Sequence, residues 1–215
     1  KSTVARAVAR RLGLRYLDTG AMYRALTWLA LQHRLDLEDA EALAELAERV
    51  VLVVGTDPEA STIAVDGTPI GDEIRSRAVT NAVSAVAAVP AVRKRLVSQQ
   101  QAIVAAGRDA GGIVVEGRDI GTVVAPDAPV KVFLTASTQV RAQRRSHEMG
   151  EDGEDDVART LAELDRRDVL DSDRTADPLA AAPDAEVLDS TRMSVGEVVA
   201  LVLVRCDRVL AGDPP

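Results

Sequence analysis

Aromatic side chains are scarce in this sequence of 215 residues, since phenylalanine, tryptophan and tyrosine together account for 2% of it. Alanine, valine and leucine must therefore fill the core, and a hydrophobic content of 47% is ample for one globular domain with a subdomain or two. The single cysteine, Cys206, excludes a disulfide within the chain and is typical of a reducing compartment. No apolar run approaches the roughly 20 residues of a membrane span, and no signal peptide is visible. We therefore expect a cytoplasmic protein with no membrane partner.

Histidine is nearly absent as well. His33 and His147 are accompanied by no cysteine–histidine cluster, which argues against a zinc site and against a histidine-based catalytic triad. The formal net charge of −8 at pH 7 is unfavourable for a general nucleic-acid surface, although a local basic cleft is compatible with it. We expect a monomer that binds no nucleic acid polymer.

The first three residues, Lys1, Ser2 and Thr3, match the end of a phosphate-binding loop, G-x-x-x-x-G-K-[ST], whose glycines and central strand would lie upstream. In such a loop, backbone N–H groups and a helix N-terminus surround phosphate oxygens, the lysine reaches the β- and γ-phosphates, and the hydroxyl binds Mg²⁺. The pattern predicts that these residues bind phosphate groups, with Ser2 as a metal ligand. The alternative is a chance Lys-Ser pair.

Hydrophobic periodicity predicts alternating strands and helices, and therefore a parallel α/β sheet. Strands are expected at residues 15–17, 112–115, 130–134 and 186–189, and helices at residues 3–12, 21–32, 39–49, 74–86, 91–107, 137–148, 157–168 and 195–211. Two β runs at 50–55 and 62–65, followed by an Asp66-Gly67 turn, predict a small antiparallel insertion. The polar segment 149–156 is expected to be a mobile tip, and a loop is expected to hold Asp171 and Arg174.

Charged residues gather at two places. Glu116, Arg118 and Asp119 follow a buried strand, where charges are costly unless they are paired with each other or meet a ligand. Arg141, Arg144 and Arg145 stand at i, i+3 and i+4 on one helix face, where their mutual repulsion favours a bound anion.

These arginines suit phosphoryl transfer, which needs positioning, Mg²⁺ and cations around the migrating group. A nucleotide phosphate is already mostly dianionic at neutral pH, because its second pKa is roughly 6. No general base is then required, which agrees with the lack of a catalytic histidine. The polar tip between two arginine-bearing helices suits a lid that excludes water.

The sequence resembles the bacterial cytidylate kinases, a family of nucleoside monophosphate kinases. The matching stretches cover nearly the whole chain in order: residues 17–24, 71–75, 81–84, 117–124, 126–134, 165–168 and 187–191. The resemblance implies a P-loop kinase fold, in which helices flank a parallel central sheet, with a β-rich nucleotide-binding insertion and a helical lid. The core would comprise residues 1–36, 108–140 and 176–215, the monophosphate-binding subdomain residues 37–107, and the lid residues 141–175.

By the same resemblance, the reaction transfers the γ-phosphoryl group of ATP, with Mg²⁺, to CMP or dCMP. The implied cytosine readers are Ser84, Arg93, Asp119 and Arg174; the implied ribose contacts are Tyr23, Arg167 and Asp171; the implied acceptor-phosphate arginines are Arg24 and Arg118. Thr19 stands where the family usually has serine, and its hydroxyl would also contact CMP. Lys1, Arg118, Arg141 and Arg145 would be catalytic, and Lys1, Ser2, Thr3, Arg141 and Arg145 would bind ATP. The chemistry agrees, because a carboxylate accepts from the cytosine amino group and a guanidinium donates to its carbonyl and ring nitrogen.

Asp18 and Glu116 are candidates for a separate Mg²⁺-binding acid, and the alternative is a metal held by Ser2, water and phosphates. Other functions also stay open. A shikimate- or gluconate-type P-loop kinase would lack the β-rich insertion and the 117–121 stretch. A GTPase-like switch would need an Asn-Lys-x-Asp motif, which we do not find. A non-catalytic nucleotide-binding protein is the third alternative.

Overall fold

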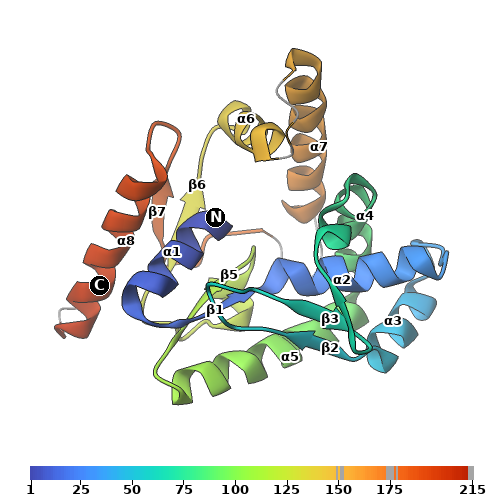
Figure 1. The fold of residues 1–215 in the computed structure, drawn as a ribbon, viewed down its shortest axis with the longest axis horizontal. Helices are drawn as coiled ribbons and strands as arrows, with labels where there is room; N and C mark the ends of the chain where they lie inside the picture. Colours follow the sequence, from blue (N-terminus) through green and yellow to red (C-terminus); the bar gives the residue numbers. More distant parts are fainter. Residues whose placement is uncertain (149, 151–152, 173–176, 178, 213–215) are drawn as a thin grey trace. The chain divides into compact units, whose positions relative to one another are not determined.

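A computed structural model describes residues 1–148, 150, 153–172, 177 and 179–212, and within these residues the protein is a helix-rich mixture of α and β structure (Figure 1). The chain divides into two compact units, Lys1–Asp127 (unit 1) and Ala128–Pro215 (unit 2). Unit 1 contains α1 (Ser2–Leu12), β1 (Arg15–Asp18), α2 (Thr19–Gln32), α3 (Ala40–Arg49), β2 (Leu52–Val54), β3 (Ile63–Val65), β4 (Thr68–Ile70), η1 (Asp72–Arg75), α4 (Arg77–Ala88), α5 (Pro90–Asp109), β5 (Ile113–Glu116) and η2 (Ile120–Val124). Unit 2 contains β6 (Val132–Thr135), α6 (Thr138–Glu148), α7 (Glu154–Ser172), β7 (Glu186–Asp189) and α8 (Val195–Leu210).

Two parallel strands organise the functional end of unit 1. β1 pairs with β5 in a register that sets Tyr16 opposite Val114 and Asp18 opposite Glu116, so both strands end in a carboxylate at the same edge. Helix α1 packs on this pair and ends at Gly13, whose left-handed φ of 64° is one that glycine adopts readily.

Helix α2 is the central element of unit 1. It begins directly after β1, and Asp18 caps it by accepting a hydrogen bond from the Ala21 N–H at 2.9 Å. Its buried residues include Met22, Leu26 and Ala30, and it contacts α4, η1 and β3. The helix is therefore covered on several sides, which fixes the direction of the side chains in its first two turns.

The antiparallel insertion predicted from the sequence is confirmed. β2, β3 and β4 form a three-stranded sheet in which Val65 pairs with Thr68 across a two-residue turn. Asp66 and Gly67 have φ of 49° and 80°, as a type I′ hairpin turn requires. Leu52 and Ile63 lie on the buried face of this sheet.

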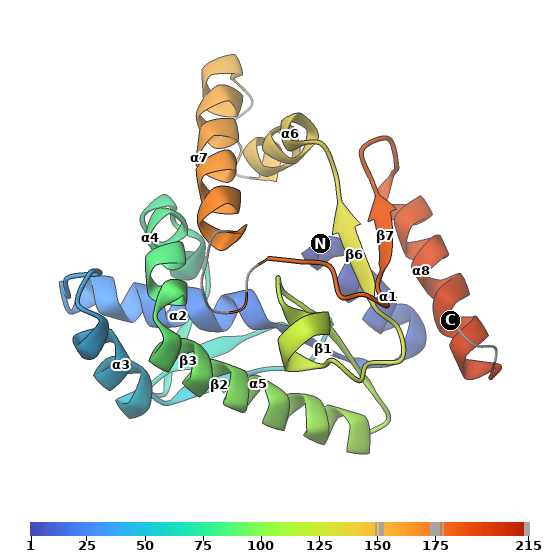
Figure 2. The same ribbon diagram turned by 180° about the vertical axis from the view of Figure 1, so that it is seen from behind.

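Unit 2 is built around a second parallel pair, β6–β7. In Figure 2, α8 runs alongside β7, and α6 lies next to α7. The predicted capping box of α8 is present, because Ser194 Oγ accepts from the Glu197 N–H and Glu197 accepts from the Ser194 N–H. No helix within the described ranges is long and apolar enough to cross a membrane.

Three expectations need correction. Among the described residues, parallel strands form two separate pairs, β1–β5 and β6–β7, whereas the sequence predicted one sheet. An apolar run predicts a buried strand but does not specify its neighbour. Glu154–Asp156 form the first turn of α7, where acidic residues favour the helix dipole, and not part of a tip. Asp171 lies inside α7 and not in a loop, because the helix continues past Asp168 through the exposed Val169 and Leu170. Outside the described residues lie 149 and 151–152 of the predicted tip, 173–176, which include Arg174, and 178.

Candidate functional site

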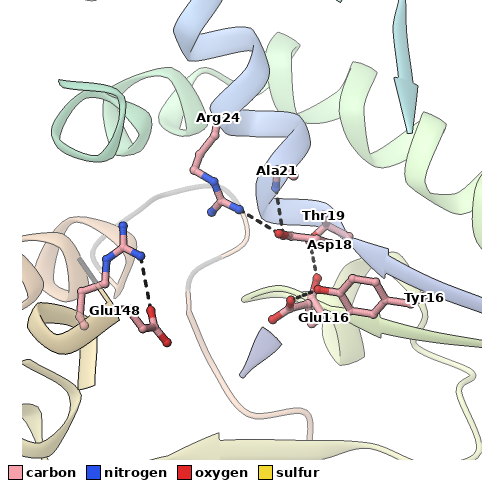
Figure 3. A network of polar contacts seen from close by, with 8 residues as sticks. Tyr16, Asp18, Thr19, Ala21, Arg24, Glu116 and Glu148 are labelled. Atoms are coloured by element: carbon pink, nitrogen blue, oxygen red, sulfur yellow. Dashed lines mark hydrogen bonds and ion pairs between the residues drawn. The ribbon is translucent and has the colours of Figure 1, made fainter. Parts of the chain in front are cut away.

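The two strand ends of unit 1 are joined by side chains from both strands (Figure 3). The Tyr16 hydroxyl donates to Glu116 Oε1, and the Thr19 hydroxyl donates to the Glu116 backbone oxygen at 2.8 Å. All three residues are buried. The proton of Thr19 is thus committed to Glu116, so toward a ligand this hydroxyl can act as an acceptor only.

Arg24 is held by the strand end that precedes its own helix. Its Nη2 donates to Asp18 Oδ2 at 2.9 Å, while Asp18 Oδ1 accepts from the Ala21 N–H (Figure 3). The Arg24 side chain is 19% exposed, and its buried Nε has no hydrogen-bond partner among the described residues. Asp18 therefore both caps α2 and orients Arg24.

A buried ion pair joins α5 to the segment after β5. Arg93, which is 3% exposed, donates through Nη2 to Asp119, and its guanidinium carbon lies 5.8 Å from the centroid of the Tyr23 ring. Ser84 is buried on α4, which packs against both α2 and α5. Two of the predicted cytosine readers, Arg93 and Asp119, are therefore in contact with each other.

The remaining predicted residues of unit 1 lie at the end of β5 and at the start of α1. Arg118 is half-buried between Glu116 and Asp119. Lys1 occupies the N-cap position of α1, Ser2 is half-buried in its first turn, and Thr3 is exposed. The N–H groups of this turn form the kind of helix N-terminus that binds anions.

Burial affects the titration of Tyr16. Desolvation raises the pKa of its phenol well above the ordinary value of 10.0, and the negative charge of Glu116 and the hydrogen bond to it raise that pKa further. Tyr16 therefore remains a hydrogen-bond donor to Glu116 throughout the physiological range.

The three arginines of α6 take three different partners. Arg141 donates to Asp168 of α7 at 2.5 Å and to Thr138 Oγ1 at 3.2 Å, whereas Arg145 lies 3.5 Å from Glu148 of its own helix. Arg144 turns away from both and donates to backbone oxygens after β7. Helical spacing indicates that the three lie toward one side of α6. It does not set what each guanidinium contacts, and here the three contacts differ.

Two of the three predicted ribose contacts, Arg167 and Asp171, lie one helical turn apart on α7, whereas Tyr23 lies on α2. Arg167 Nε is 3.7 Å from Asp171 Oδ2, and Asp171 is 2% exposed. The third predicted residue of this region, Arg174, lies outside the described residues.

The acids considered for Mg²⁺ are engaged elsewhere, Asp18 with Arg24 and Ala21, and Glu116 with Tyr16. No group of three or more His, Cys, Asp or Glu side chains within the described ranges is arranged to hold a metal. Mg²⁺ usually keeps several waters and binds few protein groups beside substrate phosphates. Ser2 suits that mode, since its hydroxyl makes no hydrogen bond to the part of the chain that the structure describes.

Sequence reasoning missed the residues that hold the predicted ones in place. Tyr16 and Asp168 were not candidates. Arg144 was expected to help bind an anion and not to hold its helix, and Asp18 was considered for the metal and not for Arg24. The only available signal was local: Asp18 stands between a strand and a helix, which is a cap position.

The chain was compared with known proteins. The family model described as cytidylate kinase matches residues 1–208. The cytidylate kinase of Rhodococcus opacus is 49% identical over 215 residues, covering 99% of this chain and 93% of that protein. The cytidylate kinase of Streptomyces griseus is 49% identical over 213 residues (98% and 90%), and that of Mycobacterium leprae is 50% identical over 201 residues (93% and 87%). Because the family model matches nearly the whole of this chain, the chain belongs to the cytidylate kinase family.

Proposed function

We propose that the protein transfers the γ-phosphoryl group of ATP to CMP or dCMP, giving ADP and CDP or dCDP, and that the residues named from the sequence perform this reaction. Membership of the family supports the activity. The observation that carries the assignment of the acceptor is the buried Arg93–Asp119 pair beside Tyr23.

This pair suits recognition of a cytosine edge. Asp119 accepts from the exocyclic amino group, and Arg93 donates to the ring nitrogen and the carbonyl. Uracil presents a carbonyl where cytosine has the amino group, so its oxygen would face a carboxylate. Because both charges are buried, the wrong base leaves them imperfectly paired, which is the basis of strong discrimination. Ser84 and Arg174 are assigned to the same base, and the Thr19 hydroxyl is assigned to CMP.

Arginines at the strand ends are assigned to the acceptor phosphate. Asp18 holds Arg24 by one nitrogen, and the buried Nε remains without a hydrogen-bond partner within the described residues. Arg118 follows the adjacent strand. A guanidinium oriented in advance by a carboxylate loses little freedom when it binds a phosphate. Tyr23, Arg167 and Asp171 are assigned to the sugar.

The donor end is assigned to the start of α1 and to α6. Lys1, Ser2 and Thr3 would meet ATP at a helix N-terminus, and Arg141 and Arg145 would neutralise charge on the transferring group. Mg²⁺ bound with ATP would bridge phosphate oxygens and be held by Ser2. In this proposal the molecule is a monomer with a P-loop kinase fold. It has the monophosphate-binding subdomain at residues 37–107 and the lid at residues 141–175.

The test is a coupled ADP-release assay with ATP, Mg²⁺ and each of CMP, dCMP, UMP, AMP and GMP. We expect turnover with CMP and dCMP well above the others. The matched variant is Asp119→Asn, because Asp119→Ala would leave the buried Arg93 charge unpaired and destabilise the fold. In Asp119→Asn the preference for CMP over UMP should fall by about 1–3 kcal/mol, while the KM for ATP stays unchanged. A raised KM for ATP with unchanged base preference would contradict the assignment of Asp119.

A further inference from the structure

We propose that Arg144 is a positioning residue for the donor side of the reaction: it anchors α6, and thereby Arg141 and Arg145, to the segment that follows β7. The inference rests on the proposed function, since it concerns how the two arginines assigned to ATP are oriented. It assigns Arg144 a role distinct from theirs.

The contacts of Arg144 are all with one short segment. Its Nη2 donates to the backbone oxygens of Ser190 at 2.9 Å and of Met193 at 3.1 Å, and its Nη1 lies 3.3 Å from Ser190 Oγ. Ser190 is 4% exposed and is itself fixed to the end of β6, because its N–H and its hydroxyl both bond to the Thr135 oxygen at 2.8 and 2.9 Å. The guanidinium of Arg144 therefore attaches α6 to a segment that is itself fixed to β6.

A second anchor lies at the start of the same helix. The Ser137 N–H donates to Thr191 Oγ1 at 2.9 Å, and Thr191 is fixed in turn by Asp189, whose Oδ1 accepts from the Thr191 N–H at 2.9 Å and from its hydroxyl at 2.5 Å. Ser137 and Arg144 are seven residues apart, or about 10 Å along a helix. Two attachments at this separation fix the direction of α6 as well as its position.

Arg141 lies between these two anchors, and Arg145 comes directly after the second. Their partners are side-chain carboxylates, of which Asp168 is half-buried and Glu148 exposed. A nucleotide phosphate can replace either carboxylate without leaving the guanidinium unpaired, and for the exposed Glu148 the cost is small, because surface ion pairs contribute little. If an anion bound Arg144 instead, the backbone carbonyls of Ser190 and Met193 would lose the hydrogen bonds that Arg144 donates to them. Arg144 is therefore suited to hold the helix, and its neighbours to bind the ligand.

The first experiment compares Arg144→Ala and Arg144→Lys with Arg205→Ala. The last variant is the matched control, because Arg205 pairs with Glu186 at the opposite end of β7 through a largely exposed contact. A misplacement of about 1 Å can cost about 100-fold in rate, so we expect kcat/KM for ATP to fall about 10- to 100-fold in Arg144→Ala. The KM for CMP should change less than about twofold. Arg144→Lys should recover part of the loss, because an ammonium donates to the same carbonyls, and Arg205→Ala should behave as wild type.

The second experiment separates positioning from direct contact with ATP. In an Arg141→Ala background, Arg144→Ala should lower kcat/KM for ATP only a few-fold if Arg144 acts through Arg141. If Arg144 contacts ATP independently, the full decrease should be seen in this background as well. A lower melting temperature with wild-type kinetics, or full additivity with Arg141→Ala, would overturn the inference. If Arg144→Ala does not fold, Arg144→Gln takes its place in both experiments. Wild-type protein that releases no ADP with CMP would refute the proposed function itself, and the inference with it.

Discussion

At the scale of single residues, Tyr16 carries a testable part of the stability of the site. Its hydroxyl is the hydrogen-bond donor to a buried Glu116 carboxylate. Tyr16→Phe would leave that oxygen without its donor, so we expect a loss of about 1–3 kcal/mol in the free energy of unfolding at pH 7. Urea unfolding followed by circular dichroism measures this loss.

The same variant has an expected pH dependence. An unfolded tyrosine loses its proton above pH 10.0, whereas burial raises the pKa of the folded Tyr16 and keeps the proton bound. The unfolded chain then binds fewer protons than the native one, so the contribution of Tyr16 is fully present below pH 10.0 and declines above it. Phenylalanine does not titrate, and the two proteins should converge in stability as the pH rises from 10 to 11. A difference that stays constant over this range would show that Tyr16 titrates normally.

Residue identities were more predictable than residue partners. Arg93 and Asp119 could be named from the sequence, but their pairing with each other depends on how α5 meets the end of β5. Likewise Arg141 and Arg144 looked equivalent at i and i+3, and only the fold separates a carboxylate partner from two carbonyl partners. Spacing along one element indicates which residues share a face, but it does not indicate what lies opposite.

At the scale of elements, the end of β5 depends on one glycine. A Cβ on Gly117 would overlap Thr19 Oγ1 and lie 2.6 Å from the Cδ1 of Ile120. In Gly117→Ala the Thr19 side chain must move away from Glu116. We expect this overpacking to cost about 1–3 kcal/mol of stability and to raise the KM for CMP, measured by urea unfolding and the ADP-release assay.

A matched control is Gly196→Ala in the first turn of α8, where the nearest atom to the added Cβ is Ser194 Oγ at 4.0 Å. Alanine is the better helix former, so this variant should gain up to about 1 kcal/mol. Equal effects of the two substitutions would mean that the contact between Gly117 and Thr19 is not tight in solution.

Elements with local signals were predicted well. The turn at Asp66-Gly67, the capping box at Ser194 and the stop at Gly13 each depend on residues within four positions of one another. The pairing of β1 with β5 joins residues about a hundred positions apart, and nothing local specifies it. The end of α7 was placed too early for a related reason: its last turn buries Asp171, a residue that the apolar pattern does not count.

At the scale of the whole molecule, the resemblance to cytidylate kinases drawn from the sequence is confirmed by the family model and by close relatives. Composition alone could not have identified this family, since a net charge of −8 does not indicate a site for anionic ligands. The information lies in where the arginines stand. Arg24 and Arg93 are each held by one carboxylate, so positive charge is kept locally within an acidic chain.

Because the chain is acidic, we expect its stability to change at low pH, and two ion pairs of unit 2 allow this change to be measured. Hydrogen bonding from Lys131 lowers the pKa of Asp184 below its ordinary 3.8, and hydrogen bonding from Arg205 lowers that of Glu186 below 4.5. The unfolded carboxyls therefore take up protons first as the pH falls, so these contributions are present above pH 4.5 and are lost below it. We expect wild type to be more stable than the double variant Asp184→Asn/Glu186→Gln at pH 6, and the two to converge in urea unfolding by pH 3. General repulsion among the remaining positive charges affects both proteins alike and is reduced by salt. The comparison at pH 3 is therefore repeated in 0.5 M NaCl, where the screening length is roughly 4 Å. A difference in the free energy of unfolding that persists there would rule out these carboxyls as its source.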